Sequence, residues 1–287
     1  MSLHRKLTWL ITGASSGLGQ CLAIEALKAG HEVIGTSRNI ANAEKSCPEF
    51  AKGGGKWLSL DPGQASAQET LSKLLEGYSI DVLVNNAGYA FIGGLEDTSE
   101  EDVRSQMEVN YYGPLRTLRA VLPGMRAKGS GNIVLISSGA GFIARPARST
   151  YSASKFAIEA AHESLSHEVQ PFGIKVLIVE PGAFRTPFSS RILTPLQYES
   201  TGGVSEAYRG TAVEQMVHAT RTMGNTPEAL KGDPEKAARA ILTAVCHGHD
   251  FLRLPLGEDC ISALEMKIND LKKDLTATRE IALSSNF

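Results

Sequence analysis

The sequence predicts an α/β fold in which a doubly wound parallel sheet of about seven strands is covered by helices on both faces. Short apolar runs alternate with longer stretches of helical periodicity along the chain. Such runs are typical of strands buried on both faces, and parallel strands need crossover helices between them. With 287 residues, of which 42% are hydrophobic, the chain can bury the core of one such domain.

The individual elements follow from these patterns. Strands are predicted at residues 7–11, 32–36, 56–60, 82–84, 132–137, 175–179 and 250–254. A long helix is predicted to begin after the N-cap residue Ser99, and another at Pro234 after the N-cap Asp233. The chain shows no repeat, low-complexity tract or linker, so a single domain over residues 1–287 is expected.

A glycine-rich segment directly follows the first predicted strand and precedes a helical pattern. It reads Thr12-Gly13-Ala14-Ser15-Ser16-Gly17-Leu18-Gly19. In a Rossmann-type dinucleotide-binding turn, the first glycine permits the tight turn, the second lets the backbone approach a pyrophosphate, and the third lets helix and strand pack closely. The free N–H groups of the following helix then attract the phosphates. The alternative, a plain strand-to-helix turn, does not require three glycines at this spacing.

Three polar residues are candidates for acid–base chemistry. Tyr151 and Lys155 are four residues apart, so on a helix they share a face. A nearby ammonium would favour the phenolate and lower the pKa of Tyr151 from its usual value near about 10. Ser138 ends a predicted buried strand, so its hydroxyl would lie at the strand's carboxyl end. Together they suit proton transfer to or from a carbonyl or alcohol oxygen, whereas the tyrosine and lysine alone would equally suit a solvated helix face.

Several motifs in a fixed order resemble those of the short-chain dehydrogenase/reductase family in its single-domain form. The match runs from Leu7 to about Leu256. Beyond the segments already named, it includes Asn85-Asn86-Ala87-Gly88, Val109-Asn110-Tyr111-Tyr112-Gly113, and Pro181-Gly182 with Thr186. The resemblance implies a Rossmann-type oxidoreductase that couples hydride transfer to proton exchange.

The resemblance assigns roles to four catalytic candidates: Asn110, Ser138, Tyr151 and Lys155. Tyr151 would donate a proton to the carbonyl oxygen, or remove it in the reverse reaction, and Ser138 would orient that oxygen. Lys155 would lower the Tyr151 pKa and bind the nicotinamide ribose. Asn110, within a long helix, would hold a water that links the lysine to solvent; the alternative is an asparagine satisfied by neighbouring backbone.

The glycine-rich turn and the resemblance together imply a set of cofactor contacts. They are Gly13, Ser15, Ser16, Gly17, Leu18, Gly19, Ser37, Arg38, Asp61, Asn86, Ala87, Gly88, Tyr151, Lys155, Pro181, Gly182 and Thr186. After the second strand no carboxylate appears before Glu44 to bind the ribose hydroxyls, and Arg38 can pair with a 2′-phosphate. NADP(H) is therefore the predicted cofactor, although Arg38 also suits an ordinary surface position.

Two regions interrupt the regular alternation. Residues 183–232 form a long insertion without strand patterns, and the resemblance implies a lid over the substrate. Apolar and aromatic residues in this region favour a lipophilic or aromatic substrate, or else packing of the insertion itself; they are Phe188, Leu193, Leu196, Tyr198, Tyr208, Met216 and Met223, with Phe142 from another loop. A C-terminal amphipathic helix is predicted over residues 258–281, either packed on its own domain or binding a partner. Its apolar stripe comprises Ile261, Leu264, Ile268, Leu271 and Leu275.

Composition limits the other classes of partner. A net charge of −2 provides no basic surface for nucleic acid, and no run approaches the ~18 apolar residues of a membrane span. Four scattered cysteines are typical of reduced thiols in a cytoplasmic protein. His247 and His249 lack a third ligand nearby, so no metal is expected. Helices that are apolar on more than one face, together with the resemblance, imply a homodimer or homotetramer.

Three functions fit these observations. The leading hypothesis is an NADPH-dependent reductase of a small-molecule ketone or aldehyde. The second is a secondary-alcohol dehydrogenase that uses NADP or NAD with the same residues. The third is a catalytically silent dinucleotide-binding sensor or scaffold, for which an intact Ser138, Tyr151 and Lys155 set is not required.

Overall fold

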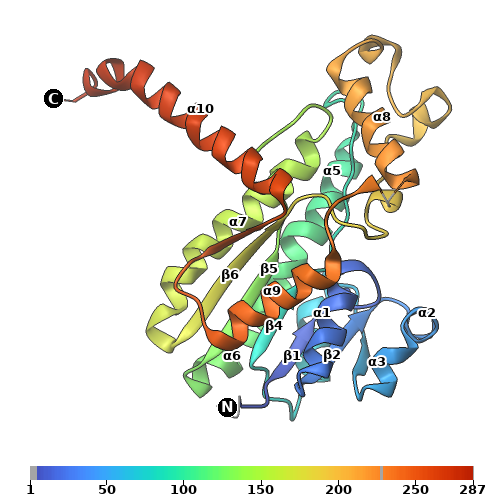
Figure 1. Cartoon of the computed structure of the whole chain (residues 1–287), viewed down its shortest axis with the longest axis vertical. Coiled ribbons are helices and arrows are strands. Elements are labelled where there is room, and N and C mark those ends of the chain that lie inside the picture. The colour runs from blue at the N-terminus through green and yellow to red at the C-terminus, as the bar shows by residue number, and fades with distance from the viewer. Residues whose placement is uncertain (1–4, 227–228, 287) are drawn as a thin grey trace.

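The computed structural model describes residues 5–226 and 229–286 and has a three-layer α/β architecture (Figure 1). One parallel sheet has the strand order β3-β2-β1-β4-β5-β6-β7. Its strands are β1 (Thr8–Ile11), β2 (Glu32–Ser37), β3 (Lys56–Ser59), β4 (Val82–Asn85), β5 (Gly131–Ile136), β6 (Ile174–Pro181) and β7 (Arg253–Leu256). The predicted fold class is confirmed.

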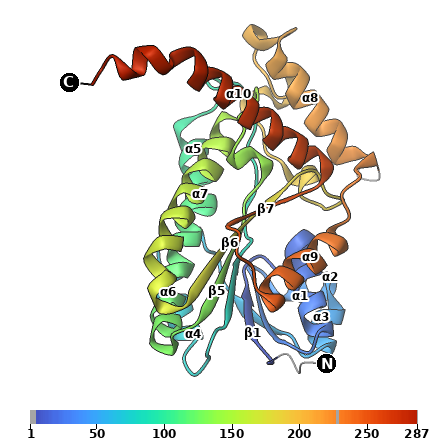
Figure 2. The same ribbon diagram turned by 60° about the vertical axis from the view of Figure 1, so that its left-hand side comes forward.

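Helices cover both faces of the sheet. The α-helices of the described residues, not all of which lie on the sheet, are α1 (Gly17–Lys28), α2 (Ile40–Ser46), α3 (Pro48–Lys52), α4 (Ala67–Leu74), α5 (Glu100–Met107), α6 (Gly113–Lys128), α7 (Ser149–Val169), α8 (Ala212–Asn225), α9 (Pro234–His247) and α10 (Glu258–Leu283). Helices α1 and α9 pack together on one face, and α4, α6 and α7 cover the other (Figure 2).

Successive side chains of β1 point to opposite faces of the sheet and contribute to the core on both faces. Trp9 and Ile11 pack with α1 and α9, whereas Leu10 packs with α4 and α6. All three side chains are fully buried. Burying an apolar side chain of this size stabilises the fold by about 1.5–3 kcal/mol, so the central strand anchors both layers.

Both predicted helix starts are confirmed by their caps. The Ser99 hydroxyl accepts a hydrogen bond from Asp102 N at 3.1 Å, and the Asp102 carboxylate accepts one from Ser99 N at 3.3 Å. The Asp233 carboxylate accepts bonds from Glu235 N and Lys236 N at 2.9 and 3.1 Å. These side chains satisfy N–H groups that have no partner within the helix.

Asn110 does not lie in a continuous α-helix, as the sequence pattern suggests. It lies in a π-helical turn, Glu108–Tyr112, between α5 and α6. Four residues further on, Pro114 has no N–H to donate to the Asn110 carbonyl. The α-helical hydrogen-bond pattern therefore breaks here, and the wider turn accommodates the break.

The last strand is displaced from its predicted position at 250–254. It spans Arg253–Leu256 and pairs with residues 178–181 of β6. The Arg253 side chain forms ion pairs with Glu159 of α7 and Glu180 of β6. These contacts with distant elements fix the register, and a local apolar pattern does not reveal them.

Helix α10 packs on its own domain only through its first turns. Cys260 and Ala263 are buried, but the rest of the helix extends away from the body (Figures 1 and 2). Along the predicted apolar stripe, Ile268 is 41% exposed, Leu271 53% and Leu275 60%. Of the two alternatives, packing against the chain's own domain therefore applies only to the first turns, and binding to a partner stays a prediction.

The helix faces expected to pair subunits are mostly used within the chain. Leu118, Val121, Ile158, Leu165 and Val169 are buried against the sheet and neighbouring helices. Tyr112 and Phe156 remain exposed near them. The expected oligomer stays a prediction.

In the described part of the chain, no helix is both long enough and apolar enough to cross a membrane.

Candidate active site

A cavity of about 910 Å³ lies along the carboxyl edge of the sheet. Of the predicted catalytic and cofactor residues, it is lined by all but Asn110 and Gly19. The lining comes from the loops after β1, β2, β3, β4, β5 and β6, together with α7, the insertion and the start of α10. Ligands of open α/β sheets bind at this edge, so the fold places the predicted residues where a dinucleotide and a substrate can meet.

The three acid–base candidates converge in this cavity. Ser138 lies two residues after the end of β5 and caps a short 3₁₀ turn, where its hydroxyl accepts a hydrogen bond from Ala140 N at 3.2 Å. Tyr151 and Lys155 lie one turn apart on α7 and are 5% and 6% exposed. The Lys155 ammonium donates to Ile136 O at 2.9 Å and lies 6.0 Å from the Tyr151 ring centroid.

Burial has the largest effect on the pKa values of Tyr151 and Lys155. It raises the pKa of the Tyr151 phenol, while Ser138 and the Arg148 guanidinium act in the opposite direction. Burial lowers the pKa of Lys155 to about 8, and the Glu159 carboxylate acts against this change. The sequence interpretation made Lys155 the cation that lowers the Tyr151 pKa. In the structure the Arg148 guanidinium acts in that direction too, and burial outweighs it, so the pKa of Tyr151 lies above its ordinary value; the role of Lys155 stays a prediction.

Asn110 lies behind the cavity wall. Its amide nitrogen donates to Tyr89 O at 2.9 Å and to the Ser154 hydroxyl at 3.1 Å, and its oxygen accepts from Tyr89 N at 3.2 Å. The side chain is therefore bound to neighbouring groups, in agreement with the alternative interpretation. It fixes the loop after β4 against α7.

The glycine-rich turn has the geometry of a phosphate site. Gly13 and Gly17 have φ angles of 65° and 59°, which residues other than glycine rarely adopt. A Cβ on Gly19 would collide with the Asn86 amide, so this position lets α1 approach the loop after β4. Helix α1 begins after Ser16 with no side-chain cap and no acidic residue in its first turn. Its free N–H groups and dipole fit a pyrophosphate.

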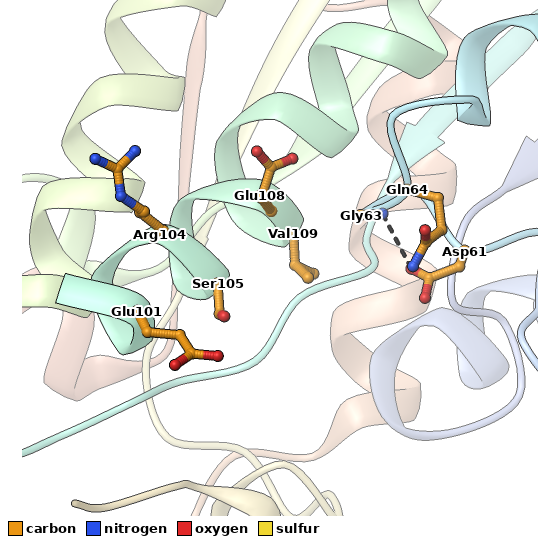
Figure 3. Close-up of a pocket in the computed structure, with 8 residues that line it drawn as sticks. All are labelled: Asp61, Gly63, Gln64, Glu101, Arg104, Ser105, Glu108 and Val109. Atoms are coloured by element: carbon orange, nitrogen blue, oxygen red, sulfur yellow. Dashed lines mark hydrogen bonds between the residues drawn. The ribbon is translucent and has the colours of Figure 1, made fainter. Parts of the chain in front are cut away.

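The groups expected around the adenosine lie at the other end of the cavity. Ser37 is largely buried and its hydroxyl bonds the backbone of Asn39, whereas Arg38 is exposed and has no ion pair among the described residues. Asp61 accepts a hydrogen bond from Gly63 N at 3.0 Å (Figure 3). It also borders a smaller hollow of about 260 Å³ that carries Glu101 and Glu108 (Figure 3). Arg104 lines the same hollow, and Arg38 lines the larger cavity.

The insertion reaches across the cavity to the glycine-rich turn. Thr186 lies against Gly17, where an added Cβ would come within 3.4 Å of the threonine. Arg191 donates from Nη1 to the Ser16 hydroxyl at 3.0 Å, a contact that no sequence pattern indicated. The insertion therefore covers the site where the phosphates are expected.

The apolar and aromatic residues predicted in the insertion lie in different surroundings. Phe188, Leu193 and Met223 line the cavity. Tyr208 and Met216 pack in a separate core, and Leu196 is 82% exposed. The cavity wall also contains Phe184, Ile192 and the start of α10, which the sequence interpretation did not assign to it.

A buried ionic cluster lies behind the catalytic residues. Glu159 and Glu180 are 3% and 0% exposed, and Arg253 pairs with both carboxylates and with Glu163 at 2.8 Å. Glu159 lies one helical turn after Lys155, and its carboxylate accepts a hydrogen bond from the Ser137 hydroxyl. Burial and the adjacent Glu159 raise the pKa of Glu180 to about 7, against Arg253, which lowers it. The only sequence signal for this cluster is a glutamate within the apolar strand β6.

Comparison with known proteins agrees with this geometry. Residues 8–196 match the family model described as short chain dehydrogenase. The chain is 44% identical over 222 residues to oxidoreductase claN of Passalora fulva, covering 77% of this chain and 98% of that protein. A solved short-chain dehydrogenase from Streptomyces avermitilis aligns with a TM-score of 0.85 and 37% identity over 99% of both chains. A serine dehydrogenase complexed with NADP⁺ aligns with a TM-score of 0.69 and 25% identity, covering 87% of this chain and 94% of that one.

The protein therefore belongs to the short-chain dehydrogenase family. Its fold and its relatives identify it as an NAD(P)-dependent oxidoreductase that acts on CH–OH or C=O groups.

Proposed function

We propose that this protein is an NADPH-dependent reductase of a lipophilic or aromatic ketone or aldehyde. The observation that carries the proposal is the convergence of Ser138, Tyr151 and Lys155 in one cavity that also holds a glycine-rich phosphate site. An acid, a hydrogen-bond donor and a cation beside a dinucleotide site are the groups that carbonyl reduction needs.

The protein's own groups handle the carbonyl oxygen and its proton. When bound, NADPH would supply the hydride that adds to the carbonyl carbon. Tyr151 donates its phenolic proton to the oxygen as negative charge develops there, and Ser138 donates a hydrogen bond to the same oxygen. Lys155, held by Ile136 O, would bind the nicotinamide ribose and would stabilise the resulting phenolate.

The choice of NADPH rests on the end of β2. A 2′-phosphate would find Arg38 without a competing ion pair among the described residues, and it would meet no carboxylate on the β2 loop. The related serine dehydrogenase complexed with NADP⁺ is consistent with this preference. Alcohol oxidation with NADP or NAD uses the same side chains and is the reverse reaction. A silent sensor would not need the intact catalytic set.

A substitution that removes only one oxygen tests the mechanism. Purified protein is mixed with NADPH and a panel of lipophilic and aromatic carbonyl compounds, and nicotinamide absorbance is followed. Tyr151→Phe should lower turnover by about 10²–10⁴-fold and leave NADPH affinity intact, because general acid catalysis is lost. The matched control is Tyr78→Phe, at a tyrosine that is 38% exposed and outside the cavity lining. Near-normal turnover in Tyr151→Phe contradicts the mechanism, and NADPH binding without turnover in the wild type supports the sensor.

A further inference from the structure

Arg148 is a largely buried cation in the wall of the catalytic cavity. It occupies the N-cap position of α7, one turn before Tyr151. Its guanidinium donates from Nη2 to the Thr220 hydroxyl of α8 at 3.3 Å, while its Nε is buried and has no hydrogen-bond partner. The side chain thus joins the catalytic helix to the insertion.

Several other shielded cations of the described residues have carboxylate partners, although the buried Lys155 bonds the Ile136 carbonyl instead. Arg116 pairs with Glu108 at 2.6 Å, and Lys128 pairs with Asp81 at 2.6 Å. Arg253 pairs with three glutamates. Arg148 forms no ion pair in the described part of the chain, and besides Tyr151 the ionisable group that acts on its pKa is another cation, Arg145.

An unpaired buried charge is costly, because its hydration is lost without a counter-charge in return. Burial and Arg145 accordingly lower the pKa of Arg148. The cavity carboxylates do not supply the missing partner. Asp61 borders the adenosine end, and Asp259 accepts a hydrogen bond from Ala183 N at 2.8 Å. Before the reaction forms a phenolate on Tyr151, an anionic ligand is the source of counter-charge that the cavity can receive.

We propose that the substrate carries a carboxylate that pairs with Arg148. This inference rests on the proposed reductase function and refines its substrate class to an apolar or aromatic ketone or aldehyde bearing one carboxylate. A planar guanidinium binds both oxygens of a carboxylate, and the surrounding wall from Phe188, Ile192 and Leu193 suits the apolar remainder. Because Arg148 is one turn from Tyr151, the carboxylate would also place the reacting carbonyl near the phenol.

A competing role for Arg148 is to act on Tyr151 alone, by lowering the phenol pKa. That role affects the reduction of every carbonyl compound equally. A carboxylate-binding role affects only substrates that carry the charge, so the ratio between a keto acid and its neutral ester separates the two.

The test compares acids with their methyl esters on the NADPH-loaded protein. The pairs are benzoylformate, benzoylpropionate and benzoylbutyrate, which vary the distance between carbonyl and carboxylate. Calorimetry measures affinity, and nicotinamide absorbance measures kcat/KM. In the wild type, at least one acid should exceed its ester by roughly tenfold or more in both measurements. Arg148→Met should bring that ratio close to unity, and Arg148→Lys should retain part of it, since a lysine keeps the charge but not the planar fork.

The matched control is Arg119→Met, on an exposed part of α6, which should keep the wild-type ratio. NADPH affinity and the circular dichroism spectrum verify folding of each variant. The proposal is wrong if the esters bind as well as the acids, if no acid binds, or if Arg148→Met keeps the acid preference. Acids that bind through Arg148 but are never reduced would overturn the proposed reductase function and leave the carboxylate site standing.

Discussion

Replacing Arg253 by methionine should destabilise the fold well beyond the loss of an ordinary surface ion pair. Arg253 is the counter-charge of two carboxylates, on Glu159 and Glu180, that are almost completely buried. Removing one partner of a buried pair typically costs about 3–5 kcal/mol. Since the Arg253 side chain is 34% exposed, we expect the lower end, about 3 kcal/mol. Methionine keeps most of the apolar stem, so the lost charge dominates.

The loss of unfolding free energy that we expect in Arg253→Met depends on pH. Glu180 has a folded-state pKa of about 7, above its ordinary value of 4.5, so its stabilising contribution is complete below pH 4.5 and is lost as the pH rises through about 7. Without Arg253 the folded-state pKa rises further. The difference in unfolding free energy between wild type and Arg253→Met should therefore be smaller at pH 5, where mainly Glu159 loses its partner, than at pH 8.

Urea denaturation at fixed protein concentration measures this difference. The two tryptophans, Trp9 and Trp57, have buried indole nitrogens and report unfolding by fluorescence. With an m-value of about 3 kcal/mol/M, the midpoint should fall by about 1 M at pH 8. The matched control is Arg239→Met, where the 48% exposed side chain pairs only loosely with Glu25 and Glu235; it should cost under about 1 kcal/mol. Equal midpoints for the two variants, or a deficit that does not change between pH 5 and 8, would refute the reasoning.

Three further predictions concern the cofactor, the lysine and the assembly. Arg38→Asp should weaken NADPH binding by roughly tenfold or more while changing NADH binding far less, because it places a negative charge beside the 2′-phosphate; equal changes in fluorescence titrations with the two cofactors would contradict it. Lys155→Met should lower both turnover and NADPH affinity, whereas Ser138→Ala should lower mainly turnover; a lysine variant with wild-type NADPH affinity would argue against ribose binding. Light scattering at micromolar concentration should give a dimeric or tetrameric mass, and a monomeric mass would count against the expected oligomer.

Local patterns were sufficient for the parts of this protein that depend on neighbours in sequence. Buried strands, the glycine-rich turn and the N-caps at Ser99 and Asp233 are each determined within a few residues. The placement of Ser138 beside Tyr151 follows from the parallel sheet, because the carboxyl ends of its strands share one edge.

The remaining features depend on contacts between distant segments. Arg191 reaches the glycine-rich turn from the insertion, and Arg253 sets the start of β7 through two buried glutamates. The Arg148 guanidinium also acts on the pKa of Tyr151, and burial outweighs it, whereas the helical spacing pointed only to Lys155. The π-helical turn at Asn110 had one local signal, Pro114, which the sequence interpretation did not use.

The pairing of α1 with α9 has a consequence for how the chain folds during synthesis. Leu22 and Ala26, near the start, are covered by Ala238 and Ile241, roughly 200 residues later, and closing such a long loop is entropically slow. Almost the whole polypeptide must therefore leave the ribosome before α9 can bury the apolar face of α1. Until then the nascent protein is a substrate for chaperones. Fragments that end before Pro234 should aggregate rather than behave as a smaller folded enzyme.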